Sequence, residues 1–197
     1  MTLFRSAAML VSLVLVPLTV TAAPPPEPTV EYSADSTMET EGGMTMKSRV
    51  YHTPTKQRME MGGADGSVTI IRKDKKVVWQ VMGDMYMEMP LDQSNAPDMG
   101  GFDIQEQTEV GEETINGLKT TKTKIIATKP DGSKFGGFFW TTKEGVTVKM
   151  DLLSKDGDKK MRMASELTNV KIEKQNPALF EVPAGATKND MGAMMGQ

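Results

Sequence analysis

The sequence predicts a mainly β protein, built as a single antiparallel sheet of about eleven strands. Two observations support this class. Turn-forming dipeptides such as Asn116-Gly117 and Asp131-Gly132 recur at short intervals, and they supply the positive φ angles that tight hairpins need. Between the turns, apolar residues alternate with polar ones at a spacing of two, which is the side-chain period of a strand. A meander this wide is expected to curl, because strand twist accumulates across it.

The chain begins with a predicted secretory signal peptide at residues 1–22. Arg5 precedes a short apolar run that ends at Val20, and the small residues Ala22 and Ala23 follow. A charged start, an apolar run too short for a stable membrane span and a small-residue cleavage site are typical of such signals. Proline is a poor residue after the scissile bond, so we place cleavage after Ala22. We therefore expect a periplasmic protein.

Composition narrows the class further. The chain has no Cys, so the signal is not of the lipoprotein type and no disulfide can form. The 23 Lys and Arg and the 26 Asp and Glu leave a net charge of −3. These charges are interspersed, which argues against a nucleic-acid partner. After the signal, no apolar stretch approaches the roughly 20 residues of a membrane span.

The elements follow in order along the chain. Prolines make residues 23–29 a stiff leader, and one β domain is predicted over residues 30–183. Its predicted strands are 30–38, 44–52, 57–62, 67–72, 77–82, 85–89, 106–114, 118–128, 134–141, 146–154 and 160–172. The segment from Pro90 to Phe102 has no strand pattern and is either disordered or a short loop or helical lid over a site. Residues 184–197 are expected to be a flexible tail.

Methionine is the most unusual part of the composition, at 18 of 197 residues. Many are spaced by two, which on a strand places them on one face. They are Met44 and Met46, Met59 and Met61, Met161 and Met163, and the triplet Met85, Met87 and Met89. The sheet is therefore predicted to have one methionine-lined face.

That face has three interpretations. It can be an ordinary core, filled by the chain's own side chains. It can be a concave apolar cavity for an acyl chain or for the lipid of a lipoprotein, because unbranched, polarizable Met side chains adapt to varied partners. It can also bind Cu(I) through thioethers, since soft ligands select soft ions. The alternation along strands, the absence of Cys and the single His argue against the copper interpretation.

Aromatic residues form two groups. Trp79 is predicted to share a strand face with Val77 and Val81. Phe138, Phe139 and Trp140 follow the pair Gly136-Gly137, which suggests a bulge or a sharp bend in that strand.

No catalytic residue, metal ligand or cofactor is predicted. His52 is the single histidine and stands beside the turn at Thr53-Pro54, so we expect it to be solvated. The sequence has no thiol nucleophile, no G-x-S-x-G motif, and no phosphate-binding or EF-hand loop. An enzyme is therefore not expected.

Several short motifs are similar to those of an exported LolA-like family, within the superfamily of the lipoprotein carriers LolA and LolB. The motifs are Arg49-Val50-Tyr51, Gln57-Arg58-Met59-Glu60, Ile70-Ile71-Arg72, Lys75-Lys76-Val77-Val78-Trp79, Met85-Tyr86-Met87-Glu88-Met89-Pro90, Gly111, Ile115-Asn116-Gly117, 120–124 and Pro177-Ala178-Leu179-Phe180-Glu181-Val182-Pro183. The resemblance covers essentially the whole mature chain. It implies an open antiparallel half-barrel with a covered concave apolar face, which in LolA and LolB shelters acyl chains.

We thus predict a non-enzymatic binding protein for a hydrophobic ligand or a lipidated protein. Candidates for the lining are Met44, Met46, Met59, Met61, Trp79, Met85, Met87, Met89 and Phe139. A Met-rich Cu(I)-binding protein and an interaction module with a filled barrel are the alternatives.

Overall fold

The computed structural model describes residues 26–63, 66–93, 103–128, 132–156 and 159–189. Within these residues the chain forms one twelve-stranded sheet, in which β12 pairs parallel to β6 and the other pairs are antiparallel. The strands are β1 (Tyr32–Thr40), β2 (Thr45–Thr53), β3 (Lys56–Met61), β4 (Val68–Arg72), β5 (Val77–Met82), β6 (Met85–Pro90), β7 (Asp103–Ile115), β8 (Leu118–Thr128), β9 (Lys134–Thr141), β10 (Thr147–Asp156), β11 (Lys159–Ile172) and β12 (Thr187–Lys188).

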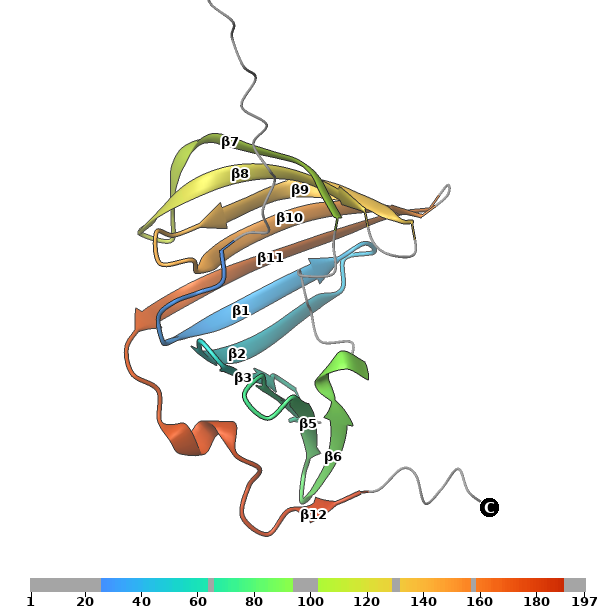
Figure 1. Ribbon diagram of the computed structural model, residues 1–197, viewed down its shortest axis with the longest axis vertical. Helices are drawn as coiled ribbons and strands as arrows, with labels where there is room; N and C mark the ends of the chain where they lie inside the picture. The colour runs from blue at the N-terminus through green and yellow to red at the C-terminus, as the bar shows by residue number, and fades with distance from the viewer. Residues whose placement is uncertain (1–25, 64–65, 94–102, 129–131, 157–158, 190–197) are drawn as a thin grey trace, which may run out of the picture.

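The sheet consists of two meanders placed side by side. Its strand order is β12-β6-β5-β4-β3-β2-β1-β11-β10-β9-β8-β7, so β1 to β6 form one meander and β7 to β11 the other. Figure 1 shows a curved sheet that stays open, with β7 at one edge and β12 at the other. The predicted mainly β architecture with an open antiparallel sheet is confirmed, and the eleven predicted strands correspond to β1 to β11. β12 was not predicted.

The two meanders join where β1 pairs with β11. The register shifts between Ser33 and Asp35 of β1, where β11 has one extra residue, and this marks a bulge in β11. Asp35 fixes this junction from both sides, because its carboxylate accepts hydrogen bonds of 2.8 Å from Arg49 of β2 and from Asn169 of β11. These two hydrogen bonds lower the pKa of Asp35.

Cross-strand register assigns the faces of the sheet, since directly opposed residues of an antiparallel pair point to the same side. Met59 lies opposite Val50 and Thr69, and Met87 lies opposite Gln80. We call the side that carries these residues the methionine face. The other side, the outer face, carries Trp79.

The buried core is divided into three clusters. One cluster joins β8, β9 and β10 through residues such as Ile125, Phe139 and Leu152. A second cluster packs Tyr32 and Ala34 of β1 against Val146 and Val148 at the start of β10. Both lie on the methionine face, whereas the third lies on the outer face of β4 and β5, where Phe180 covers Ile70, Trp79 and Val81.

The C-terminal segment supplies the cover for the third cluster. It contains the short 3-10 helix η3 (Pro177–Phe180), whose first turn is capped by the Asn176 side chain. Phe180 is 1% exposed. The chain then runs to β12, whose backbone joins the edge of β6: the Thr187 N–H donates to Asp84 O over 2.8 Å.

The leader is held beside the β9–β10 turn. The Thr29 N–H donates to Glu144 O over 3.0 Å, and the chain passes so close to Gly145 that a Cβ there would lie 2.5 Å from Glu27 O. Gly145 also has a φ of 87°, so glycine is favoured at this turn for two independent reasons.

Gly136 and Gly137 do not form the bulge considered from the sequence. The register of β9 with β8 and with β10 is continuous through both glycines. Instead, Gly137 allows close approach, because a Cβ at this position would lie 2.0 Å from Asp151 O of β10.

Several predicted segments lie outside the described residues: the signal peptide, residues 23–25 of the leader, residues 94–102 of the lid segment and residues 190–197 of the tail. The described start of the lid segment is the 3-10 helix η1 (Leu91–Gln93). No helix in the described part of the chain has the length and apolar character of a membrane span.

Candidate functional site

Most of the predicted lining residues do share the methionine face. Register places Met46, Met59, Met61, Met85, Met87, Met89 and Phe139 on this side of the sheet. Phe139 is buried within the core, whereas the methionines are half-buried or, for Met85, exposed. These thioethers therefore form a surface that is partly accessible.

Two predicted lining residues lie elsewhere. Met44 precedes β2, in the turn after β1, and its side chain is 63% exposed. Trp79 is on the outer face, because it lies opposite Glu88, whereas Met87 lies opposite Gln80. The two-residue turn Gly83-Asp84 sets this arrangement, and sequence reasoning did not use its effect on register. It pairs Met82 with Met85, and this pairing puts Trp79 and the methionines of β6 on opposite sides.

The structure adds methionines that were not chosen from the sequence. Met38 lies directly opposite Met46, and Met82 lies opposite Met85. Met150 lies opposite Phe139, and Met163 lies opposite Leu152. The methionine face therefore extends from β6 across β1 to β10.

The methionines gather toward one end of the strands, where the β1–β2 and β5–β6 turns lie. Accessibility is greatest there, with Met82 44% exposed, Met85 47% and Met161 61%. The opposite end is closed by the buried cluster around Tyr32 and by the leader. The face is thus packed at one end and accessible at the other.

Small polar side chains interrupt the apolar surface. Thr69 donates to Gln80 Oε1 over 2.8 Å in the same cross-strand row as Met59 and Met87. A pocket of about 250 Å³ lies toward the packed end of the face. Its lining consists of Pro26, Gln107, Thr121, Thr123, Phe139, Thr141, Thr142 and Lys143.

The pocket differs from the cavity expected for an acyl chain. Its volume of about 250 Å³ is below the roughly 300 Å³ at which ligand cavities begin. Phe139 is its one predicted lining residue, and threonines take the place expected for methionines. The described residues therefore offer an open methionine face rather than an enclosed methionine cavity.

His52 is buried, which corrects the expectation of a solvated histidine. It is 7% exposed, and its ring stacks on Tyr32 with 5.0 Å between the ring centroids. Nδ1 lies 3.3 Å from Val30 O, and since a carbonyl can only accept, Nδ1 carries the proton. Burial lowers the pKa of His52, so the ring is held neutral.

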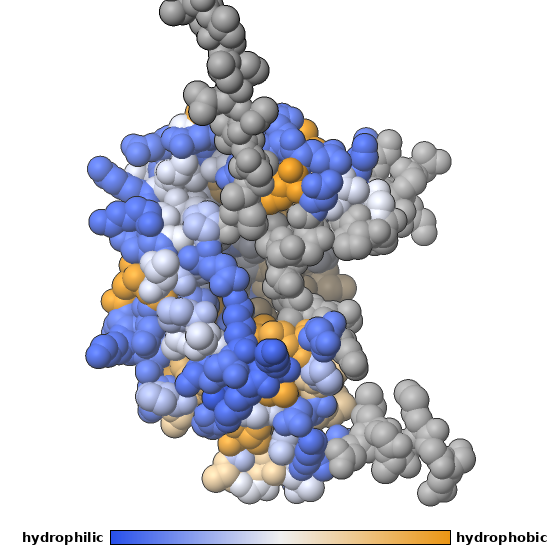
Figure 2. Space-filling model, viewed as in Figure 1, coloured by the Kyte–Doolittle hydropathy of each residue, from blue (hydrophilic) through white to orange (hydrophobic). Residues whose placement is uncertain are grey.

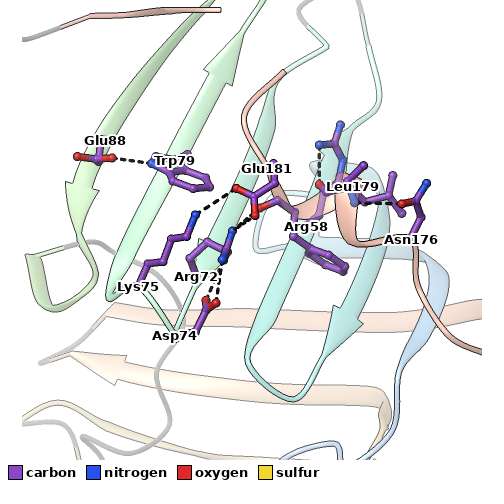
Figure 3. A network of polar contacts seen from close by, with 11 residues as sticks. Arg58, Arg72, Asp74, Lys75, Trp79, Glu88, Asn176, Leu179 and Glu181 are labelled. Atoms are coloured by element: carbon purple, nitrogen blue, oxygen red, sulfur yellow. Dashed lines mark hydrogen bonds and ion pairs between the residues drawn. The ribbon is translucent and has the colours of Figure 1, made fainter. Parts of the chain in front are cut away.

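A polar network on the outer face holds the C-terminal segment (Figure 3). The Arg72 side chain is 4% exposed and donates two hydrogen bonds of 2.8 Å to Asp74. It also donates to Phe180 O over 3.0 Å and to the Glu181 carboxylate. The Asp74 pKa falls to about 2, chiefly because of its hydrogen bonds with Arg72.

Trp79 takes part in the same network. Its indole N–H donates to Glu88 over 2.8 Å, and the ammonium of Lys75 lies 5.0 Å from its ring centroid. Together with the burial of Phe180, these contacts give the outer-face cluster a structural role. No group of three or more His, Asp or Glu side chains among the described residues is arranged to hold a metal ion.

Figure 2 shows the side of the molecule that is seen in Figure 1. Hydrophobic surface appears there as separate small patches within a mostly hydrophilic surface. The accessible apolar area on this side is therefore divided rather than gathered into one broad patch.

Comparison with solved structures shows what the chain is similar to. It is similar to MucB, with a TM-score of 0.55 and 11% identity over 82% of this chain and 60% of that chain. It is also similar to a chain in the complex of Pseudomonas aeruginosa MucA and MucB, with a TM-score of 0.52 and 10% identity over 80% of this chain and 57% of that chain. This chain thus spans a little more than half of those chains.

A further similar structure is the LolA superfamily protein NE2245 from Nitrosomonas europaea, with a TM-score of 0.44 and 9% identity over 79% of this chain and 91% of that chain. No protein-family model matches this sequence, and no curated protein sequence matches it. At these identities the likeness concerns the fold.

Proposed function

We propose that this chain is an exported, non-enzymatic binding protein that holds an apolar chain, of a lipid or of a lipidated protein, against its methionine face. The observation that carries the proposal is the placement of this face. Half-buried thioethers from β1, β2, β3 and β6 share one side of a curved sheet, and they are most accessible at one end. A face that served only as a core would be buried throughout.

Burial of apolar area supplies the driving force. Each methylene removed from water contributes about 0.8 kcal/mol, so a bound chain needs no covalent attachment. Met side chains can follow the shape of different chains because they have three rotatable bonds. The pocket of about 250 Å³ is too small for a long chain. The ligand therefore lies along the open face, and its release requires no large rearrangement of the sheet.

The fold supports this proposal. Its LolA-like likeness, its predicted signal peptide and the wide curved sheet are consistent with a carrier in the periplasm. MucB, which shares the fold, is seen in complex with MucA(peri). A protein is therefore one form that the partner of this chain can take.

A fluorescent polyene fatty acid tests the proposal with protein that has been refolded from denaturant, and so carries no ligand. The double variant Met59→Gln/Met87→Gln replaces two thioethers in one cross-strand row by near-isosteric amides. We expect saturable binding by the unmodified protein and an affinity at least about tenfold lower in the variant, a loss of about 1.4 kcal/mol.

Leu153→Gln is the matched control. Leu153 is 46% exposed and lies opposite Arg162 on the outer face, so we expect it to leave the probe affinity unchanged. Equal affinities in the control and the double variant, or the absence of saturable binding to the unmodified protein, would show that the methionine face is not the binding surface.

A further inference from the structure

Four methionines on consecutive neighbouring strands form a row across the methionine face. They are Met163 of β11, Met38 of β1, Met46 of β2 and Met61 of β3, and we call this row the thioether ridge. Its centre is the directly opposed pair Met38 and Met46. Along the chain these residues are far apart, and it is the pairing of β1 with β11 that brings Met163 beside the others.

Both outer members are diagonal neighbours of the central pair. Met163 lies opposite Thr40, two residues from Met38. Met61 lies opposite Ser48, two residues from Met46. Directly opposed Cβ atoms are about 5 Å apart and diagonal ones about 7–8 Å, within reach of long side chains. The three rotatable bonds of Met allow the sulfur atoms to converge.

The ridge is accessible, and it is not used to pack the core. Met38, Met46 and Met61 are half-buried, and Met163 is 37% exposed. The three core clusters are built from other residues, chiefly Val, Ile, Phe and Ala. Leu or Ile would cover this part of the sheet equally well, so hydrophobicity alone does not account for four thioethers at these positions.

The donor atoms of the thioether ridge determine which kind of metal ion it can bind. Thioethers are neutral, soft donors, and soft donors select Cu(I) over hard cations such as Ca²⁺ or Mg²⁺. The chain has no Cys and one His, and that histidine is buried against Tyr32 at the packed end of the sheet. The soft ligand set therefore consists of methionine.

We propose that the thioether ridge binds one Cu(I) ion through Met38, Met46 and one of the two flanking methionines. This site goes beyond the binding of an apolar chain and does not depend on it. The sequence alone argued against copper because the methionines alternate along strands. The register removes this objection, because it places one methionine from each of four neighbouring strands in the same row.

Silver(I), a soft ion that does not change its oxidation state, is the first probe. The full mature chain, labelled with ¹³C at the Met methyl groups, is titrated with Ag(I) in chloride-free buffer and followed by NMR. We expect one equivalent to bind and to shift the methyl signals of Met38 and Met46 together with Met61 or Met163. Shifts confined to other methionines, including Met191, Met194 and Met195 of the tail, would overturn the proposal.

Competition with a Cu(I) chelator under anaerobic, reducing conditions gives the affinity. We expect Met46→Leu, and Met38→Leu as a second variant, to weaken Cu(I) binding at least about tenfold, because each removes one sulfur ligand and keeps the apolar bulk. Met89→Leu is the matched control, since Met89 lies opposite Val78 on the same face, and we expect no change there. Equal Cu(I) affinities in Met46→Leu and Met89→Leu would overturn the proposal.

The fatty acid probe separates this proposal from the preceding one. Both ligands, the fatty acid probe and Cu(I), are measured on the unmodified protein. Circular dichroism confirms that each variant is folded. A chain that binds the probe and no Cu(I) overturns the copper site alone, and a chain that binds Cu(I) and no probe overturns the apolar-chain function alone.

Discussion

His52 shows at the level of one residue how burial creates pH dependence. The folded state holds the ring neutral against Tyr32 and lowers its pKa, whereas in the unfolded chain the ring takes a proton near pH 6.5. The unfolded state therefore binds more protons in this window. The contribution of His52 to stability is complete above pH 6.5 and is lost as the pH falls toward its folded pKa.

We accordingly expect the free energy of unfolding, measured with urea at several pH values, to fall between pH 7 and pH 5. His52→Phe keeps an aromatic ring on Tyr32 and removes the titrating group, so it should flatten the profile in this range. Because the chain has one His, an unchanged profile in the variant would assign the dependence to carboxyl groups.

Gly137 and Gly136 offer a second test at the scale of single residues. A Cβ at Gly137 would lie 2.0 Å from Asp151 O, whereas a Cβ at Gly136 would lie 3.2 Å from Ile125 O. The first clash involves backbone that cannot move without breaking the β9–β10 ladder. We expect Gly137→Ala to destabilise the protein by about 3 kcal/mol and Gly136→Ala by about 1 kcal/mol. Denaturant unfolding measures both, and similar losses would contradict the register given for β9.

At the scale of elements, the C-terminal segment acts as a strap on the outer face. Arg58 donates to Leu179 O over 3.0 Å and Arg72 donates to Phe180 O over the same distance. The strap thus combines one buried aromatic ring with charged donors that satisfy its carbonyl groups. It leaves the methionine face uncovered, because it packs on the opposite side.

Phe180→Ala removes the centre of the strap. Phe180 is 1% exposed, and loss of a buried Phe side chain typically costs about 3–5 kcal/mol. We expect a loss in this range in urea unfolding. Lys174→Ala, at an exposed position of the same segment, is the control and should change stability by less than about 0.5 kcal/mol. A small effect of Phe180→Ala would mean that the strap contributes little to the fold.

At the scale of the whole molecule, the sequence predicted strands and faces better than it predicted their mutual positions. Turn dipeptides and alternation identified β1 to β11, and parity within one strand correctly grouped Trp79 with Val77 and Val81. Which face of one strand meets which face of the next depends on register. That is why Trp79 was assigned to the methionine side and why the pair Met38 and Met46 was not foreseen.

Long-range contacts were the least predictable. β12 has two residues and no alternation to detect, and its place is set by backbone hydrogen bonds to β6. The burial of His52 depends on its contacts with Tyr32 and Val30. These two residues lie about 20 positions earlier in the chain, on the other side of the β1–β2 hairpin. The pocket is bordered by threonines from two strands and by Pro26 of the leader, and none of these carries a local signal for a cavity.

The pairing of β1 with β11 also fixes the order in which the protein can be completed. The ribosome makes β1 first among the strands, whereas its partner β11 is made after β2 to β10. The pairing of Tyr32 with Ile172 can therefore form only after most of the domain has been synthesised. Until then the nascent first meander exposes a bare strand edge, where wrong partners can add. We therefore expect folding of the sheet to be slow and to finish late, because the pairing that joins its two meanders connects segments far apart in the sequence.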